Sequence, residues 1–483
     1  MIYFEKFFIK YSAFILLFLF FIDLLLQSFI KGGRWDLYQH FSMADKIIRG
    51  ESIYSTFDDG FYQASSPYFP GISFFTFIIT KINIEFRKEI MLFFSVSIGV
   101  IFIYLLSKVK NKINGSLDIN SSFVLTLLLF IWFFKDWRFY MTELKPDTIL
   151  ILLAIGVFFT IDKIERTPAN KLNYLFLLIY LYFIGIIKQQ GISIYVGVFT
   201  YFLLCNKNDF IVRMFVLSTI ILSGIFVLVT LYSTENCINN TIIIFSKHQF
   251  LNLGEIKTFL INDFNSQWLV YILVFTTINL MFLKRVKINN LEKLWLFISI
   301  PWLLMCLISY VKIGGNNGNI QSGLIPLIPI ILSVLQKTLI KSVFTIKFIQ
   351  MSLFFSVIII FLNIRESYKI YNLTNEIESN HINFLKKYKN KNVLYNSNYY
   401  DILIKSGVLP KTDMNTAYDF YLANTNMDNY YNHINNKKYD LILADLSEYK
   451  DVDLQRIIFK RYKFYKQKDI PVSLAYKILV PKK

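Results

Sequence analysis

Long apolar runs alternate with short, mostly basic connections over the first three quarters of the chain. A helix that crosses a membrane needs roughly 20 predominantly apolar residues, and about 17 can suffice. This pattern predicts an all-α polytopic membrane protein. The candidate segments are 11–30, 67–83, 91–107, 121–139, 148–161, 172–187, 190–205, 212–232, 266–283, 294–311, 321–336 and 345–363.

The basic connections predict how the chain threads through the membrane. Loops rich in Lys and Arg, such as 108–120, belong on the cytoplasmic side. If every segment crossed, this loop would fall outside, against its charge. The conflict disappears if segment 67–83, which is broken by Pro67 and Pro70, does not cross. We therefore predict about 11 transmembrane helices, a cytoplasmic N-terminus and a single outer loop over 31–90.

The composition changes after residue 365. The stretch 366–483 is polar, rich in Tyr and Asn, and has no run long enough to span a membrane. Short β-like runs with helix-like segments between them predict a small extracytoplasmic α/β domain, so that the chain divides into a transmembrane domain, 1–365, and this domain. The β-like runs are Asn392–Tyr395, Asp440–Ala444 and Ala475–Val480.

Composition excludes several classes of protein. The mean hydropathy of +0.45 and the 55% of hydrophobic residues are too high for a soluble domain of 483 residues. The net charge of +18 is accounted for by cytoplasmic loops, so we expect no nucleic-acid partner. Cys205, Cys237 and Cys306 are scattered along the chain, which argues against a disulfide framework and against a structural zinc.

Two carboxylates stand where predicted spans meet the outer side. Asp36 follows the first span and is flanked by Arg34 and aromatic residues. Ionisable groups at that depth are costly unless they are used, although an N-cap or an ion pair with Arg34 would also explain Asp36. Asp147 follows Lys145 and Pro146 at the start of a span. For Asp147 the alternative is stabilisation by the positive end of the helix dipole.

Two lysines complete the set of candidates. Lys188 opens the short turn Lys188-Gln189-Gln190-Gly191 between two apolar segments, and Lys312 precedes a Gly- and Asn-rich loop. Lys188 could instead extend its ammonium group to the membrane interface. We interpret His40 as an ordinary loop residue.

The order of short motifs resembles a known family. Asp36, then Gly50-x-x-x-Tyr54 and then Tyr68-Phe69-Pro70, look like the first outer loop of the GT-C glycosyltransferases. That superfamily includes protein O-mannosyltransferases, aminoarabinose transferases and bacterial mannosyltransferases. The resemblance covers roughly residues 1–365. Similar later loops are Leu144-Lys145-Pro146-Asp147, Ile187-Lys188-Gln189-Gln190-Gly191 and Lys312-Ile313-Gly314-Gly315-Asn316-Asn317.

The resemblance implies an enzyme of the bacterial plasma membrane that transfers a sugar, with inversion, from a polyprenyl-phosphate donor. The acceptor would be an extracytoplasmic glycan, lipid or protein. Asp36 would be the general base and Asp147 a second acidic contact. The donor phosphate would be bound by Lys188, Lys312, Arg34 and Lys145. No soluble cofactor is expected, and a divalent cation is left open because the sequence does not say whether Asp36 and Asp147 come together.

Three other functions remain open. A polysaccharide polymerase would share the many spans and a large outer loop. A flippase or transporter of lipid-linked saccharides would usually carry paired, inverted halves with broken helices, and we find no such pairing. A non-catalytic assembly subunit is the remaining alternative, if Asp36 is dispensable.

Overall fold

The computed structural model describes residues 2–30, 35–54, 66, 68–83, 86–114, 119–134, 145–205, 210–248, 250–312, 317–338, 343–423, 426–446, 452–465 and 477–482. Contacts divide the chain into two compact units. The helical unit comprises residues 1–28, 92–230 and 250–367, and the mixed unit comprises 29–91, 231–249 and 368–483. The predicted boundary at residue 365 is close to the last transition, but the mixed unit also takes in two earlier segments.

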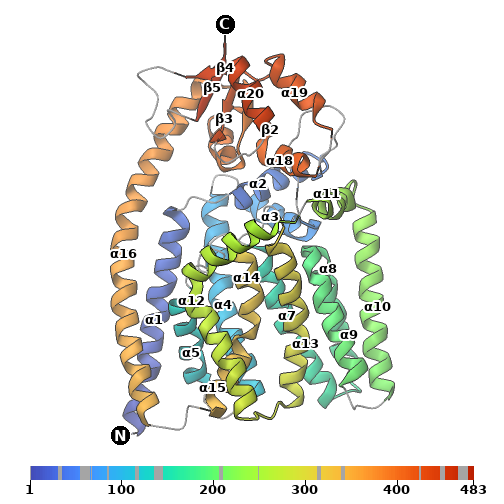
Figure 1. Ribbon diagram of the computed structural model, residues 1–483, viewed down its shortest axis with the longest axis vertical. Helices are drawn as coiled ribbons and strands as arrows, with labels where there is room; N and C mark the ends of the chain where they lie inside the picture. The colour runs from blue at the N-terminus through green and yellow to red at the C-terminus, as the bar shows by residue number, and fades with distance from the viewer. Residues whose placement is uncertain are drawn as a thin grey trace. The chain divides into compact units, whose positions relative to one another are not determined.

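The helical unit is built from long helices that run alongside one another (Figure 1). Several of the predicted apolar segments are extended by polar residues at one end, so the observed helices are longer than the apolar runs. The helices are α1 (Ile2–Ile30), α4 (Arg87–Ile113), α5 (Ile119–Trp132), α7 (Pro146–Arg166), α8 (Lys171–Ile187), α9 (Ile192–Leu204), α10 (Phe210–Tyr232), α12 (Leu253–Leu283), α13 (Asn290–Tyr310), α14 (Asn317–Leu324), α15 (Ile328–Thr338) and α16 (Val343–Leu385).

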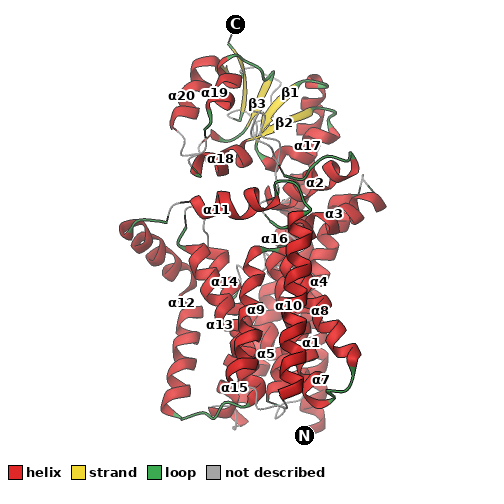
Figure 2. Cartoon of the chain, turned by 90° about the vertical axis from the view of Figure 1, so that its right-hand side faces the viewer, coloured by secondary structure: helices red, strands yellow, loops and turns green. Residues whose placement is uncertain are grey.

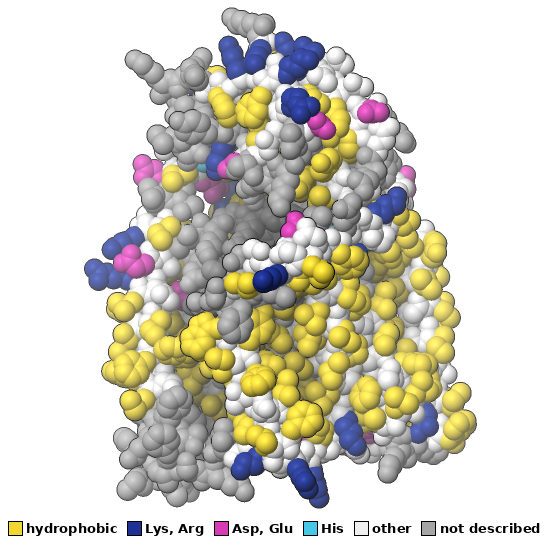
Figure 3. All heavy atoms as spheres, viewed as in Figure 1, with side chains coloured by type: hydrophobic (Ala, Val, Ile, Leu, Met, Phe, Trp, Pro, Cys, Tyr) yellow, Lys and Arg dark blue, Asp and Glu magenta, His cyan; other side chains and the backbone are white. Residues whose placement is uncertain are grey.

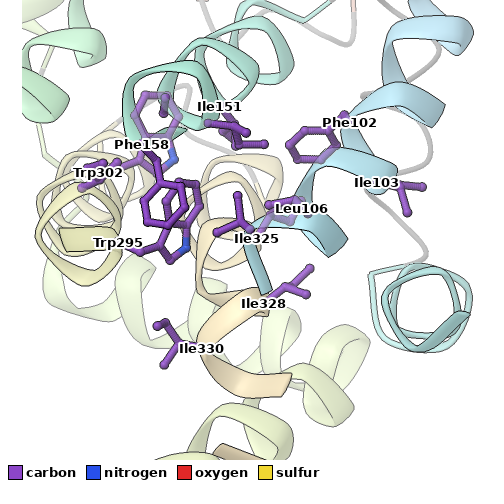
Figure 4. Packing of buried hydrophobic residues seen from close by; sticks show 14 of the residues in the cluster. Phe102, Ile103, Leu106, Ile151, Phe158, Trp295, Trp302, Ile325, Ile328 and Ile330 are labelled. Atoms are coloured by element: carbon purple, nitrogen blue, oxygen red, sulfur yellow. The ribbon is translucent and has the colours of Figure 1, made fainter. Parts of the chain in front are cut away.

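Aromatic and aliphatic side chains fill the interior of the helical unit (Figure 4). Trp295 of α13 meets Phe158 of α7 edge to face, with ring centroids 5.3 Å apart. The indole N–H groups are satisfied: Trp295 donates to the carbonyl of Pro326 at 2.6 Å and Trp302 to that of Ser322 at 2.9 Å. Buried indoles need such partners, so these bonds fix α13 against the segment that contains α14.

Five helices of the described residues are long and apolar enough to cross a membrane, as expected for a polytopic membrane protein. The face of the molecule seen in Figure 3 is mostly hydrophobic over its helices. The predicted count of about 11 spans stays a prediction. The five are Arg87–Ile113, Phe210–Tyr232, Asn290–Tyr310, Ile320–Thr338 and Met351–Tyr388. Shorter apolar helices are Phe14–Ser28, Pro70–Ile82, Ser122–Trp132, Lys171–Ile187 and Trp268–Leu283.

The mixed unit contains a five-stranded sheet with strand order β2-β1-β3-β5-β4. The two parallel pairings join β1 to β2 and to β3, whereas β5 is antiparallel to both β3 and β4. The sheet confirms the predicted α/β character of the C-terminal region. The strands are β1 (Asn392–Tyr395), β2 (Leu409–Asp413), β3 (Leu441–Leu443), β4 (Tyr462–Phe464) and β5 (Ile478–Pro481).

One face of this sheet is covered by helices that connect its strands in the chain (Figure 2). Leu394, Ile442 and Leu479 point into a core with side chains from the three helices. Their strand neighbours point to the opposite face. On β1 and β3 these neighbours are also buried, so both faces of the central strands are covered. The covering helices are α18 (Met414–Leu422), α19 (Asp428–Asn435) and α20 (Val452–Arg461).

The first outer loop of the sequence prediction belongs to the mixed unit. It forms α2 (Trp35–Ile48) and α3 (Pro70–Ile82), which pack against each other. The 13 residues of α3 rise about 20 Å, less than the roughly 30 Å of a hydrocarbon core. Arg87, only 2% exposed, donates to Asp45 at 2.8 Å and to Asp401 at 3.3 Å. This ion pair joins α2 to α17 (Tyr400–Lys405).

Candidate functional site

A buried ion pair joins two of the predicted site residues in the helical unit. The Nζ atom of Lys188 donates to Oδ1 and Oδ2 of Asp147 at 3.0 and 2.9 Å. Both residues are 5% exposed. The sequence predicted these two residues separately, as acid and phosphate ligand. The structure brings them together.

Local sequence positions Asp147. Pro146 occupies the first turn of α7, where its missing N–H is not needed and its fixed φ suits the helix. Lys145 before it is extended, with φ −62° and ψ 135°, and its carbonyl accepts a bond from the N–H of Thr148 at 3.1 Å. Asp147 therefore lies in the first turn, where the helix dipole favours a carboxylate.

The turn that carries Lys188 requires glycine at its end. Lys188 is extended between α8 and a short 3-10 helix, η1 (Gln189–Gly191). A Cβ atom on Gly191 would collide with the main-chain carbonyl oxygen of Ile184. Gln190 donates to Ser309 Oγ of α13 at 3.2 Å. Close packing of the turn against α8 and its bond to α13 thus hold the Lys188 backbone in place.

Ser322 is a site residue that sequence reasoning missed. Its hydroxyl donates to Asp147 Oδ1 at 3.1 Å, from α14. The Asp147 carboxylate therefore accepts three hydrogen bonds from two side chains. A lone Ser in an apolar segment gives no signal in the sequence, because its role depends on which helix it faces.

The stability of this cluster depends on whether both partners of the ion pair are present. A buried ion pair is worth little over an apolar substitute, but removing one partner leaves an unpaired charge and costs roughly 3–5 kcal/mol. An apolar helical unit that keeps such a pair is either using it for chemistry or for specificity of packing. The buried pair is therefore a candidate functional site, and the alternative is that it only makes the packing of the helices specific.

The other predicted residues are placed as follows. The backbone of Asp36 lies in the first turn of α2, in the mixed unit, but its side chain and all of Arg34 lie outside the described residues. Lys145 is half-buried before α7. The ammonium of Lys312 lies over the ring of Phe250, 5.3 Å from its centroid, and their backbones form an antiparallel bridge.

The interpretation of His40 as a loop residue was wrong. His40 lies in α2, one helical turn after Asp36, and is 1% exposed. Neither of its ring nitrogens has a hydrogen-bond partner among the described residues, and burial lowers its pKa to about 4. Its ring lies 6.0 Å from that of Tyr68.

The described residues suggest no metal site. They contain no group of three or more His, Cys, Asp or Glu side chains placed to hold an ion. The Asp147 carboxylate is engaged by Lys188 and Ser322. The ammonium of Lys188 and the hydroxyl of Ser322 already bind this carboxylate, so we derive no step through a metal ion.

Comparisons with known proteins identify the fold. No protein-family model matches the sequence, and no curated protein is significantly similar to it. The structure is similar to the apo crystal structure of the Archaeoglobus fulgidus oligosaccharyltransferase, with a TM-score of 0.51 and 12% identity over 97% of this chain and 75% of that one. The chain shares the fold of that archaeal enzyme.

The same archaeal enzyme tethered to an acceptor peptide gives a TM-score of 0.46 at 11% identity, over 96% of this chain and 75% of that one. At such identities the likeness concerns the fold. This fold agrees with the many apolar helices that the hydrophobic runs predicted, and the small sheet agrees with the α/β domain predicted from the β-like runs after residue 365. Because one fold hosts different activities, the activity depends on the residues of the site.

Proposed function

We propose that the chain is an integral membrane glycosyltransferase. It transfers a sugar from a polyprenyl-phosphate donor to an extracytoplasmic acceptor, with inversion at the anomeric carbon. The observation that carries the proposal is the buried pair of Asp147 and Lys188 within a GT-C-like fold. Charged groups kept inside an apolar helical protein usually mark a substrate path.

In the proposed reaction the acceptor hydroxyl gives its proton to the carboxylate of Asp36. The bond from the acceptor oxygen to the anomeric carbon forms on the face opposite the phosphate. The bond from that carbon to the phosphate oxygen breaks, and the lipid phosphate leaves with the electron pair. A positioned carboxylate base contributes typically 10²–10⁴-fold.

Lys188 stabilises the negative charge that develops on the departing phosphate. A fixed cation in a site without water is worth far more than one in solution. In this scheme Asp147 holds the Lys188 ammonium in one position before the donor arrives. Lys312 and Lys145 add positive charge to the donor site, and no step requires a nucleotide.

The test is a transfer assay with the full-length chain in liposomes and synthetic polyprenyl-phosphate hexoses and pentoses. Wild type should transfer sugar to acceptor, and Asp36→Asn should lose about 10²-fold or more of that rate. Asp453→Asn is the matched control, because that carboxylate is 68% exposed in α20. If Asp36→Asn transferred sugar at the full wild-type rate, Asp36 would not be the general base. Transfer only from polyprenyl-diphosphate saccharides would identify a polymerase instead.

A further inference from the structure

A second candidate site is an apolar cavity between α9 and α13, two helices of the helical unit that pack together. Its volume is about 330 Å³, at the small end of the range for ligand pockets, about 300–1,000 Å³. Thr200 of α9 lines one side, and the apolar residues of α13 that line it are Leu296, Phe297, Ile300 and Pro301. Because these walls offer few polar partners, they fit a hydrocarbon chain better than a sugar or a nucleotide.

Local sequence explains why this space is open. Pro301, inside α13, has no N–H, so the carbonyl of Phe297 lacks its usual helical partner. Gly197 of α9 packs so closely against that carbonyl that a Cβ atom would collide with its oxygen. The two helices therefore touch at Gly197. About one turn later in α9, the small side chain of Thr200 leaves room for the cavity.

Basic side chains stand at one end of the cavity. Lys293, near the start of α13, is the only charged residue among the described residues that line it. Lys284, Arg285 and Lys287 precede it in the connection from α12, and all four residues are exposed. None of the four side chains has an ion-pair or hydrogen-bond partner among the described residues. Their charges are therefore available to an anion.

The carboxylates of the adjoining helices are directed to other partners. Glu292 of α13 is buried and accepts a hydrogen bond from Lys337 at 2.6 Å. Glu165 of α7 accepts from the Tyr201 hydroxyl at 3.1 Å, and Asp162 of α7 is paired with two cations of its own. None of these carboxylates is paired with Lys293 or with the three cations before it.

Basic connections are expected on the cytoplasmic side of any membrane protein. The connections 205–209 and 284–289 contain four Lys or Arg residues and one acidic residue, Asp209. The positive-inside rule accounts for these loops. It does not account for an otherwise apolar cavity to which Lys293, a residue of the helix itself, contributes its side chain.

We propose that this cavity binds one acyl chain of an anionic glycerophospholipid, whose phosphate contacts Lys293 and the cations of the α12–α13 connection. Basic pockets between transmembrane helices on the cytoplasmic side bind anionic headgroups in this way. A zwitterionic lipid offers the same chains without the net charge. A helix of another protein, about 10–12 Å across with its side chains, is too wide for a cavity of about 330 Å³.

This lipid site is distinct from the proposed donor site. Gln190, in the turn that carries Lys188, donates to Ser309 near the end of α13. Ser309 follows Lys293 by 16 residues in that helix, which corresponds to about 24 Å along its axis. A phosphate bound beside Lys293 is therefore too far from Lys188 to be the leaving group. The inference does not depend on glycosyl transfer.

The test is native mass spectrometry of the full-length chain released from nanodiscs. The nanodiscs contain equal amounts of phosphatidylglycerol and phosphatidylcholine with the same acyl chains. Wild type should retain phosphatidylglycerol over phosphatidylcholine by about tenfold or more, and Lys293→Gln should lower this preference by about fivefold. Lys171→Gln is the matched control and should leave the preference unchanged, because Lys171 is exposed at the start of α8 and does not line the cavity.

A second variant tests the acyl chain separately from the charge. Thr200→Trp fills the cavity, so it should lower the amount of retained phosphatidylglycerol by about tenfold or more. Val196→Trp is its control, because Val196 is 52% exposed on the same helix and does not line the cavity. Ile300→Trp replaces Thr200→Trp if that variant fails to fold.

Four results would overturn the inference. The first is equal retention of the two lipids by the wild type. The second is an unchanged preference in Lys293→Gln, and the third is unchanged retention in the variant that fills the cavity. The fourth is displacement of phosphatidylglycerol by an equal amount of polyprenyl phosphate or by a second copy of the chain, which would assign the cavity to that occupant.

Discussion

Lys188 donates two hydrogen bonds to Asp147, 41 residues earlier in the chain, and both side chains are buried. Asp147 is at the beginning of α7 and Lys188 follows the end of α8, and these two helices pack together. The pair therefore links the beginning of one helix to the end of the next. Ser322 adds α14 to the same carboxylate.

Breaking this pair should be more harmful than removing it. We expect Asp147→Asn and Lys188→Met each to lower the free energy of unfolding by about 3–5 kcal/mol, because each leaves a buried polar group without its partner. The double variant Asp147→Leu/Lys188→Met should recover most of that loss. Thermal unfolding in micelles measures both.

The exposed pair of Arg456 and Asp453, 3.2 Å apart, is the control for that experiment. Its removal should change stability by less than about 1 kcal/mol. If the double variant is stable but inactive in the transfer assay, the pair has a role in chemistry. If it is stable and fully active, the pair serves packing alone.

Gly191→Ala should destabilise the helical unit. Its new methyl group would collide with the carbonyl oxygen of Ile184, so the Lys188 turn must shift. Overpacking of this kind typically costs about 1–3 kcal/mol. Gly224→Ala in α10 is the matched control, because a methyl group there meets no atom within 4 Å. Equal melting temperatures for the two variants would contradict the steric argument.

His40 should make the mixed unit sensitive to acid. Burial lowers the pKa of this imidazole from 6.5 to about 4. The unfolded chain therefore takes up a proton first, and stability falls as the pH drops from about 6.5 to 4. The loss approaches about 3 kcal/mol at the lower limit. His40→Phe should lack this acid-dependent loss of stability, whereas His433→Phe should keep it. Urea unfolding of both variants and of wild type at several pH values measures the difference.

The threading of the chain can be tested with single cysteines. After replacement of Cys205, Cys237 and Cys306, we expect Asp428→Cys to react with an impermeant thiol reagent from outside the cell. Lys284→Cys should react only after the membrane is opened, because its loop is basic. Both positions are exposed. Labelling of both from the same side would refute the positions predicted for the loops.

The amino-acid sequence by itself determined the features that depend on local patterns. Apolar runs predicted helices because a 20-residue apolar stretch has few other stable forms in a membrane. The runs at Asn392–Tyr395, Asp440–Ala444 and Ala475–Val480 predicted strands that the structure contains, with small shifts at their ends. Strand β2 was missed because Pro410 argues against a strand. Pro410 is tolerated there because β2 is an edge strand.

Only the tertiary structure decided which charged groups meet. The sequence marked Asp147 and Lys188 as candidates, but their bond depends on how α7 packs against α8. Lys46 resembles any lysine near the end of a helix. Its burial arises from β1, β2 and α17, which approach α2 from more than 300 residues away in sequence. The cost of burying a charge depends on its neighbours in space, and no pattern of nearby residues reports them.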